Sequence, residues 1–278
     1  MEKGSACSHH SMAEREKAEQ ELLKKRMGSV KHKLLVLSGK GGVGKSTVAV
    51  NLAVSLALAG KRVGLLDIDV HGPSIPKLLH LEGKPVEGSE EGILPVEYGE
   101  NLKVMSIGFL MPQGEQAVIW RGPMKHGVIR QFLAQTLWGE LDFLVVDSPP
   151  GTGDEPLSIA QFLAGQAKAM VVTTPQDVAL ADVRKSILFC RKLELPVLGV
   201  VENMSGFACP HCGKVSHIFK AGGGEEMAKA MEVPFLGRVP IDPDVVASCD
   251  AGEPYVDRYK DSPAAEAFRK VIAPILEL

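Results

Sequence analysis

The feature that most constrains the fold is a glycine-rich segment, SGKGGVGKSTVAVNLA, at residues 38–53. It follows directly on a short apolar run, LLVLS at 34–38, and leads into an apolar stretch that is too short to cross a bilayer. Glycines let the backbone turn sharply where a strand gives way to a helix. A strand, a glycine turn and a helix in this order form the first unit of a parallel α/β sheet. We therefore expect the sheet of this chain to begin here.

Apolar runs alternate with amphipathic stretches along the rest of the chain, which is the pattern of βαβ units. The expected strands lie at 34–38, 62–68, 102–108, 142–147, 169–174, 196–203 and 234–240. The expected helices lie at about 45–59, 123–137, 155–164, 178–193, 222–231 and 263–273. A chain of 278 residues with 45% hydrophobic residues can fill one large core. The predicted fold class is α/β: a single doubly wound, mainly parallel β-sheet with helices on both faces, over residues 33–278.

Residues 1–32 differ in composition from the segment that follows them. Ser11 and Glu14 have the S-x-x-E spacing of a capping box, and the charged stretch up to Arg26 favours a helix. Since no continuous apolar stripe supports a docking face, we expect a charged, helical or flexible arm that is solvated. The Gly- and Glu-rich segment 81–101 predicts a surface excursion from the main domain.

The charge balance argues against two classes of partner. The formal net charge is −3 and the basic residues are spread along the chain, so neither nucleic acid nor an anionic membrane is an expected partner. The N-terminal residues contain no apolar signal region, and the cysteine count of 5 is odd. These features favour a reducing, cytoplasmic location.

Two further segments have structural interpretations. The C-terminal segment SPAAEAFRKVIAPILEL has helical spacing but few basic residues, so it is expected to pack in the core rather than to anchor a membrane. The residues expected to pack there are Val271, Ile272, Ile275 and Leu276. Cys190 lies in an expected helix and is interpreted as a small core residue, whereas Cys249 is expected in a loop without a partner.

The glycine-rich segment also carries phosphate-binding chemistry. Gly39, Gly44, Lys45 and Ser46 satisfy the pattern G-x-x-x-x-G-K-[ST], and the flanking strand and helix are the context that it requires. In this pattern the backbone N–H groups of the loop and the start of the following helix surround the anionic phosphates. Lys45 is expected to reach the β- and γ-phosphates of ATP, and Ser46 to offer its hydroxyl to Mg²⁺. The predicted nucleotide-binding residues are Gly39, Lys40, Gly41, Gly42, Val43, Gly44, Lys45, Ser46 and Thr47.

Three aspartates lie at the ends of strands that meet at one edge of the predicted sheet. Asp67 and Asp69 are at the end of the second expected strand, and Asp147 ends the fourth. Taken singly, each could be a helix cap or a turn residue. Carboxylates beside a triphosphate are unfavourable unless they hold Mg²⁺ or orient a water molecule. We therefore expect Asp147 to bind Mg²⁺ together with Ser46, and Asp69 and Lys45 to be catalytic, with Asp69 positioning the attacking water.

Lys40 gives the loop a more specific form, K-G-G-x-G-K-[ST]. This form resembles that of the deviant Walker A ATPases, a P-loop group that includes MinD, ParA and the nitrogenase iron protein. The resemblance implies a slow ATPase that works as a homodimer, in which Lys40 reaches the partner's phosphates and acts in catalysis. Three further segments, DIDVHGPSIPKLL, DSPPGTGD and VENMSGFACPHCG, resemble the Mrp/ApbC-type iron–sulfur cluster carriers within that group.

The last of these segments contains Cys209 and Cys212, spaced as C-x₂-C. A closed tetrahedral metal site needs four ligands, and no second C-x₂-C exists in the sequence. By the resemblance, each copy of the chain contributes its pair to one [4Fe–4S] cluster shared between protomers, for which four thiolates suffice. The resemblance also implies apo iron–sulfur proteins as recipients, an upstream cluster donor, and a contact of Asn203 with the nucleotide base in a pocket lined by 239–243.

The residues leave alternatives open at this point. By themselves they favour zinc at Cys209 and Cys212, because the segment CPHCGKVSH also holds His211 and His217. The competing function is therefore a MinD- or ParA-like ATP-driven dimer switch with a structural zinc site. Asn203, which follows an expected strand, could equally be an ordinary turn residue.

Overall fold

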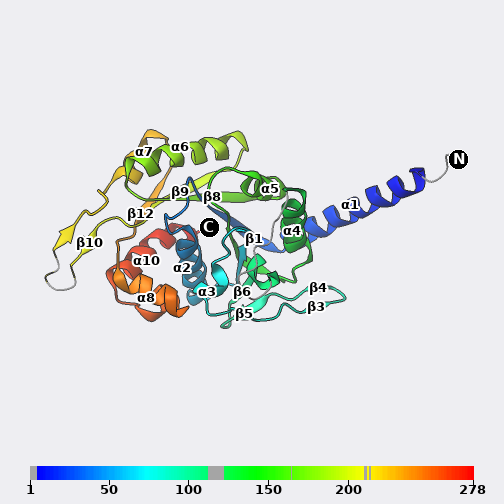
Figure 1. Ribbon diagram of the computed structural model, residues 1–278, viewed down its shortest axis with the longest axis horizontal. Coiled ribbons are helices and arrows are strands. Elements are labelled where there is room, and N and C mark those ends of the chain that lie inside the picture. Colours follow the sequence, from blue (N-terminus) through cyan, green and yellow to red (C-terminus); the bar gives the residue numbers. More distant parts are fainter. Residues whose placement is uncertain (1–4, 112–121, 164, 210–211, 213) are drawn as a thin grey trace.

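The computed structural model describes residues 5–111, 122–163, 165–209, 212 and 214–278. Its centre is an eight-stranded sheet with the strand order β12-β9-β8-β1-β7-β2-β6-β5 (Figure 1). The pairing of β5 with β6 is antiparallel and the other pairings are parallel. The strands are β1 (Val30–Ser38), β2 (Val63–Asp67), β5 (Val96–Tyr98), β6 (Leu102–Ser106), β7 (Leu141–Asp147), β8 (Ala167–Thr173), β9 (Val197–Glu202) and β12 (Phe235–Arg238). The predicted fold class is confirmed, and each predicted strand lies in this sheet.

Helices cover both faces of the sheet, because alternate residues of a strand point to opposite sides. Leu34 and Val36 of β1 lie in one hydrophobic cluster with α2, α9 and α10, whereas Leu35 and Leu37 lie in a second with α1, α4 and α5. The helices are α1 (Ser5–Gly28), α2 (Lys45–Leu58), α3 (Ile75–Leu78), α4 (Gly122–Gln135), α5 (Asp154–Phe162), α6 (Asp177–Lys192), α7 (Gly223–Ala230), α8 (Pro243–Ala251), α9 (Tyr255–Arg258) and α10 (Pro263–Leu276). The short helices α3, α8 and α9 are absent from the sequence prediction.

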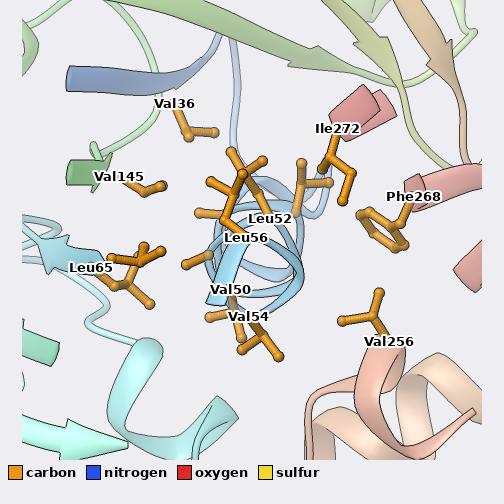
Figure 2. Packing of buried hydrophobic residues seen from close by; sticks show 14 of the residues in the cluster. Val36, Val50, Leu52, Val54, Leu56, Leu65, Val145, Val256, Phe268 and Ile272 are labelled. Atoms are coloured by element: carbon orange, nitrogen blue, oxygen red, sulfur yellow. The ribbon is translucent and has the colours of Figure 1, made fainter. Parts of the chain in front are cut away.

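Helix α2 lies between the sheet and the C-terminal helices. Residues 48–56 are all buried, and apolar side chains surround the helix axis. In Figure 2, Leu52 and Leu56 of α2 lie between Val36 of β1 and Phe268 of α10. A helix that is apolar on every side is stable when it is enclosed on every side. The enclosure of α2 fixes its first turn, where the glycine-rich loop ends.

The N-terminal segment differs from the prediction in three ways. Helix α1 begins before the capping box predicted at Ser11, and its last turns are solvated on one side only, because Leu23 and Met27 are buried in the second hydrophobic cluster while Lys24 and Lys25 are exposed. Two apolar residues one turn apart leave too weak a periodicity to be recognised as a docking face. Strand β1 begins at Val30, so residues 30–32 belong to the sheet rather than to the arm.

Two other segments contain more secondary structure than predicted. The sequence predicts a surface excursion at 81–101, and the structure places there the edge strand β5 and a small hairpin of β3 (Gly88–Ser89) and β4 (Gly92–Ile93). Strands of two or three residues are too short to show a period. Helix α10 continues past the predicted end at 273, through Pro274, and buries Val271, Ile272 and Ile275 as expected. In the part of the chain that the structure describes, no helix has both the length and the apolar content needed to cross a bilayer.

Candidate functional site

The phosphate-binding loop lies at the carboxyl end of β1 and ends in the first turn of α2. Gly42 and Gly44 both have a φ of 78°, a left-handed conformation that favours glycine. Gly44 is the N-cap residue of α2, and no side-chain hydrogen bond caps this end among the described residues. The N–H groups of the first helical turn are therefore available to an anion. A cavity of about 280 Å³ lies over the loop, lined by residues 40–47 together with Ser38, Asp69, Ser74, Leu78 and Pro150.

Close packing explains two of the glycines in this loop. A Cβ atom at Gly39 would lie 2.4 Å from the backbone carbon of Asp182 on α6, and one at Gly44 would lie 2.3 Å from Nδ2 of Asn203. Asn203 follows β9, and its Nδ2 donates a hydrogen bond to the carbonyl oxygen of Val43 at 2.9 Å. The amide of Asn203 therefore supports the loop directly, a role that the sequence analysis did not predict.

Buried charges lie beneath the loop. The Nζ of Lys45 donates a hydrogen bond to Oδ1 of Asp147, and these side chains are 6% and 0% exposed. Burial raises the pKa of Asp147, while the charge of Lys45 and hydrogen bonds from Lys45 and Ser46 act in the opposite direction. Oδ2 of Asp147 is buried without a hydrogen-bond partner among the described residues. A carboxylate oxygen that lacks a donor, beside a serine hydroxyl, is a suitable donor set for Mg²⁺, so these residues fit the predicted metal.

The two aspartates at the end of β2 have different surroundings. Asp67 is fully buried and accepts hydrogen bonds from the backbone N–H of Asp69 at 3.0 Å and from the hydroxyl of Ser106 at 2.9 Å. Burial and the charge of Asp147, its neighbour across the β2–β7 pairing, raise the pKa of Asp67 to about 7. Asp69 instead lines the cavity over the loop, and its Oδ1 accepts from the backbone N–H of His71 at 3.2 Å. The structure therefore places Asp69, and not Asp67, beside the expected phosphate position.

Lys40 lies on the same cavity and is half-buried. Its backbone carbonyl accepts a hydrogen bond from the hydroxyl of Ser38 at 3.0 Å, which helps to fix the loop at this point. The role predicted for Lys40 is directed at a second copy of the chain, so it stays a prediction.

A second cavity of about 280 Å³ adjoins the loop on the side of Asn203. Asn203 and residues 239–242 line it, together with Gly44 and Thr47, so the residues that the resemblance assigns to the base lie around one space. Cys249 also lines it, on α8 rather than in the predicted loop, with Sγ 3.9 Å from Oγ1 of Thr47. Burial raises the pKa of the Cys249 thiol. The prediction that Cys249 lies in a loop without a partner is wrong, because the short helix α8 gave no clear periodic signal.

The predicted cysteine pair lies on a hairpin that projects from the domain (Figure 1). Its strands are β10 (Phe207–Ala208) and β11 (Val215–Ser216), and the backbone N–H of Cys209 donates to the carbonyl of Lys214 at 3.1 Å. Cys209 is half-buried and Cys212 is exposed. His211, one of the possible zinc ligands, is outside the described residues, as is the side chain of Cys7. No group of three or more His, Cys, Asp or Glu side chains that could hold a metal occurs within the described part of the chain.

A polar cluster near the loop was missed by the sequence analysis. The Nζ of Lys125 on α4 lies 2.6 Å from Oε1 of Glu155 on α5 and 2.9 Å from Nε2 of His71. Glu155 is buried, and its ion pair with Lys125 holds its pKa below the usual range against the effect of burial. These contacts join two helices to the turn after Asp69. Glu155 follows the segment DSPPGTGD directly, but nothing in the sequence indicates its partner on α4.

Glu202, the last residue of β9, was missed as well. It is fully buried, and its carboxylate accepts hydrogen bonds from the backbone N–H groups of Gly222 at 2.9 Å and Gly224, and from the hydroxyl of Ser205. Arg238 lies 3.5 Å away. A buried carboxylate needs such donors. Here they fasten the end of β9 to the start of α7, on both sides of the cysteine hairpin. The sequence feature that could have identified Glu202 is a glutamate at the end of an apolar strand.

Comparison with known proteins gives the family. The family described as "ParA: NUBPL iron-transfer P-loop NTPase" matches residues 29–276. The chain belongs to this family. An iron–sulfur cluster carrier protein of Methanocaldococcus jannaschii is 50% identical over 92% of this chain and 87% of its own length. A relative named cytosolic Fe-S cluster assembly factor NUBP2 homolog, of Trichoplax adhaerens, is 49% identical over 91% of this chain and 97% of its own length.

Solved structures with the same fold include nucleotide-binding members of the group. A nucleotide-binding protein from Archaeoglobus fulgidus, in complex with ADP, is 41% identical, with a TM-score of 0.77 over 90% of this chain and 96% of that one. The cell division ATPase MinD of Pyrococcus furiosus is 25% identical, with a TM-score of 0.67 over 89% of this chain and 99% of that one. The family resemblance inferred from the sequence motifs is thus confirmed.

Proposed function

We propose that this chain is an ATP-hydrolysing homodimeric carrier that binds a bridging [4Fe–4S] cluster and transfers it to apo iron–sulfur proteins. The observation that carries the proposal is a phosphate-binding loop with a buried lysine–aspartate pair in the same domain as a projecting hairpin with two cysteines. The relatives named as an iron–sulfur cluster carrier and as a cluster assembly factor support it. The relative named as cytosolic supports a cytoplasmic location, and the chain's charge favours neither nucleic acid nor membranes as partners.

The residues around the loop support hydrolysis of ATP. The loop N–H groups and Lys45 bind the phosphates, and Ser46 and Asp147 would hold Mg²⁺, which neutralises charge on the phosphate oxygens. Asp69, which also lines the cavity, orients the water that attacks the γ-phosphorus. Lys40 of a second copy completes the charge around the transferring phosphoryl group, so that hydrolysis is slow in the absence of the dimer.

The cluster is the cargo of this protein. Cys209 and Cys212 supply two thiolates, and the same pair of a second copy completes a four-thiolate set. Because Cys212 is exposed, a cluster held there can be reached by a recipient protein. An upstream protein supplies the cluster.

The experiment is an anaerobic determination of iron, zinc and acid-labile sulfide per dimer, after reconstitution with iron and sulfide. The chain is compared with a variant that carries Cys209→Ala and Cys212→Ala, and Cys190→Ala serves as a matched control, since Cys190 is fully buried in the core. About four iron and four sulfide per dimer are expected in the parent and the control, and neither in the double variant.

The competing function is a MinD-like ATP-driven switch with structural zinc at Cys209 and Cys212, which the shared fold with MinD favours. Under that function the parent would bind zinc and no sulfide even after reconstitution. That result would exclude the carrier.

A further inference from the structure

The cavity beside Asn203 has an apolar wall that belongs to the cysteine hairpin. Met204 and Phe219 both line this cavity, as do Gly44 and Thr47 of the phosphate-binding loop. Met204 precedes β10, and Phe219 follows β11, so the two residues flank the hairpin in the chain. Family resemblance assigned Asn203 and residues 239–243 to this space but neither of these two.

The position of the cavity decides what it can hold. A nucleotide whose phosphates lie over the loop continues past Gly44 and Thr47, which line both cavities, and its base then enters the space next to Asn203. That space is mainly apolar and includes the aromatic ring of Phe219, which is 38% exposed. A planar aromatic base packs favourably on such a ring. The base is therefore expected to cover Phe219.

The residues just before β10, on the N-terminal side of the hairpin, are hydrogen-bonded to the wall of the same cavity. The backbone N–H of Ser205 donates to the carbonyl of Val239 at 2.9 Å, and that of Ile241 donates to Gly206 at 2.7 Å. Phe207 of β10 is paired with Ser216 of β11. The path from Phe219 to the cysteines is short, because Phe219 lies three residues after β11, β11 pairs with β10, and Cys209 follows β10 directly.

We infer that Phe219 is a positioning residue through which an adenine nucleotide fixes the cysteine hairpin. The base packs on the Phe219 ring, the hairpin loses freedom, and the exposed thiol of Cys212 becomes less accessible. The inference rests on the nucleotide site of the proposed function but not on the cluster, and it deepens that function by naming the residue that joins nucleotide to cargo.

The test measures the alkylation rate of Cys209 and Cys212 by iodoacetamide in the metal-free full-length protein, resolved by peptide mass spectrometry. Saturating MgADP is expected to slow the alkylation of Cys212 at least about threefold. Magnesium pyrophosphate occupies the phosphate loop without a base, and it is expected to leave the rate unchanged.

Substitutions of Phe219 and of Ile218 distinguish the effect of the Phe219 ring from that of the neighbouring residues. Phe219→Ala is expected to bind MgADP about fivefold more weakly and, at saturation, to lose the slowing at Cys212, whereas Phe219→Leu retains part of both effects. Ile218→Ala is the matched control, because Ile218 is adjacent and 57% exposed but does not line the cavity. The control should behave as the parent chain.

Several results would overturn the inference. These are an equal effect of pyrophosphate and MgADP, full slowing in Phe219→Ala, loss of slowing in Ile218→Ala, or bound MgADP without any effect on Cys212. Failure to bind MgADP would remove the nucleotide site itself and this inference with it. Since the assay contains neither iron nor sulfide, a chain that binds no cluster can still pass it, so the two proposals fail separately.

Discussion

Removal of Lys45 should destabilise the nucleotide-free protein far more than removal of a surface lysine. Lys45 is 6% exposed and Asp147 is 0% exposed, so Lys45→Ala leaves a carboxylate buried without its cation. Breaking a buried pair in this way costs about 3–5 kcal/mol of unfolding free energy. With a urea m-value of about 3 kcal/mol/M, the midpoint of unfolding should fall by at least about 1 M.

The structure provides a matched control for this experiment. Lys31 pairs with Asp142 at 2.7 Å but is 64% exposed, so Lys31→Ala is expected to cost less than about 1 kcal/mol. A double variant, Lys45→Ala with Asp147→Asn, removes the unpaired charge and should recover at least half of the loss. The measurement is urea unfolding with EDTA and without nucleotide. Equal losses for Lys45→Ala and Lys31→Ala would refute the reasoning, as would no recovery in the double variant.

Two other predictions concern Lys40 and Asp142. Lys40→Ala should bind MgADP within about threefold of the parent but hydrolyse ATP at least about tenfold more slowly, because in the proposed mechanism its charge acts on the transition state; an unchanged hydrolysis rate would remove Lys40 from catalysis. The hydrogen bond from Lys31 and that from the backbone N–H of Arg62 lower the pKa of Asp142 to about 2, so Asp142→Asn should cost about 1 kcal/mol at pH 7. Since this contribution is lost as pH falls from the unfolded pKa of about 3.9 towards 2, the stability gap measured by unfolding should narrow below pH 5, and a constant gap would contradict the assignment.

Local patterns predicted most of the sheet and the loop. Strand β7 could be predicted from the apolar run before Asp147, because a buried parallel strand needs a continuous apolar segment. The phosphate-binding loop could be predicted because its binding residues are nine consecutive residues, 39–47. Strand β5 could not be predicted, since three residues at a sheet edge are too few to display an alternating apolar pattern. The packing of Leu23 and Met27 depends on α4, a partner about 100 residues away.

The parts of the site that sequence could not predict are contacts between distant segments. Lys125 and Glu155 meet because α4 and α5 pack side by side, and no local spacing indicates that pairing. Asn203 is an ambiguous residue in the sequence, and its contact with Val43 exists because β9 and β1 end at the same edge of the sheet. Phe219 looks like an exposed loop residue until the two cavities are seen to share Gly44 and Thr47.

The enclosure of α2 gives the two ends of a bound nucleotide unequal surroundings. In the proposed site, the phosphate end meets a loop that ends in α2, whose residues 48–56 are all buried. We therefore expect the amides of this helix to exchange with solvent only when large parts of the domain open. By our inference, the base end meets Met204 and Phe219, which flank a hairpin held by a few hydrogen bonds. If the inference holds, the enclosed helix fixes the position of the phosphates, and the hairpin changes its mobility when the base binds.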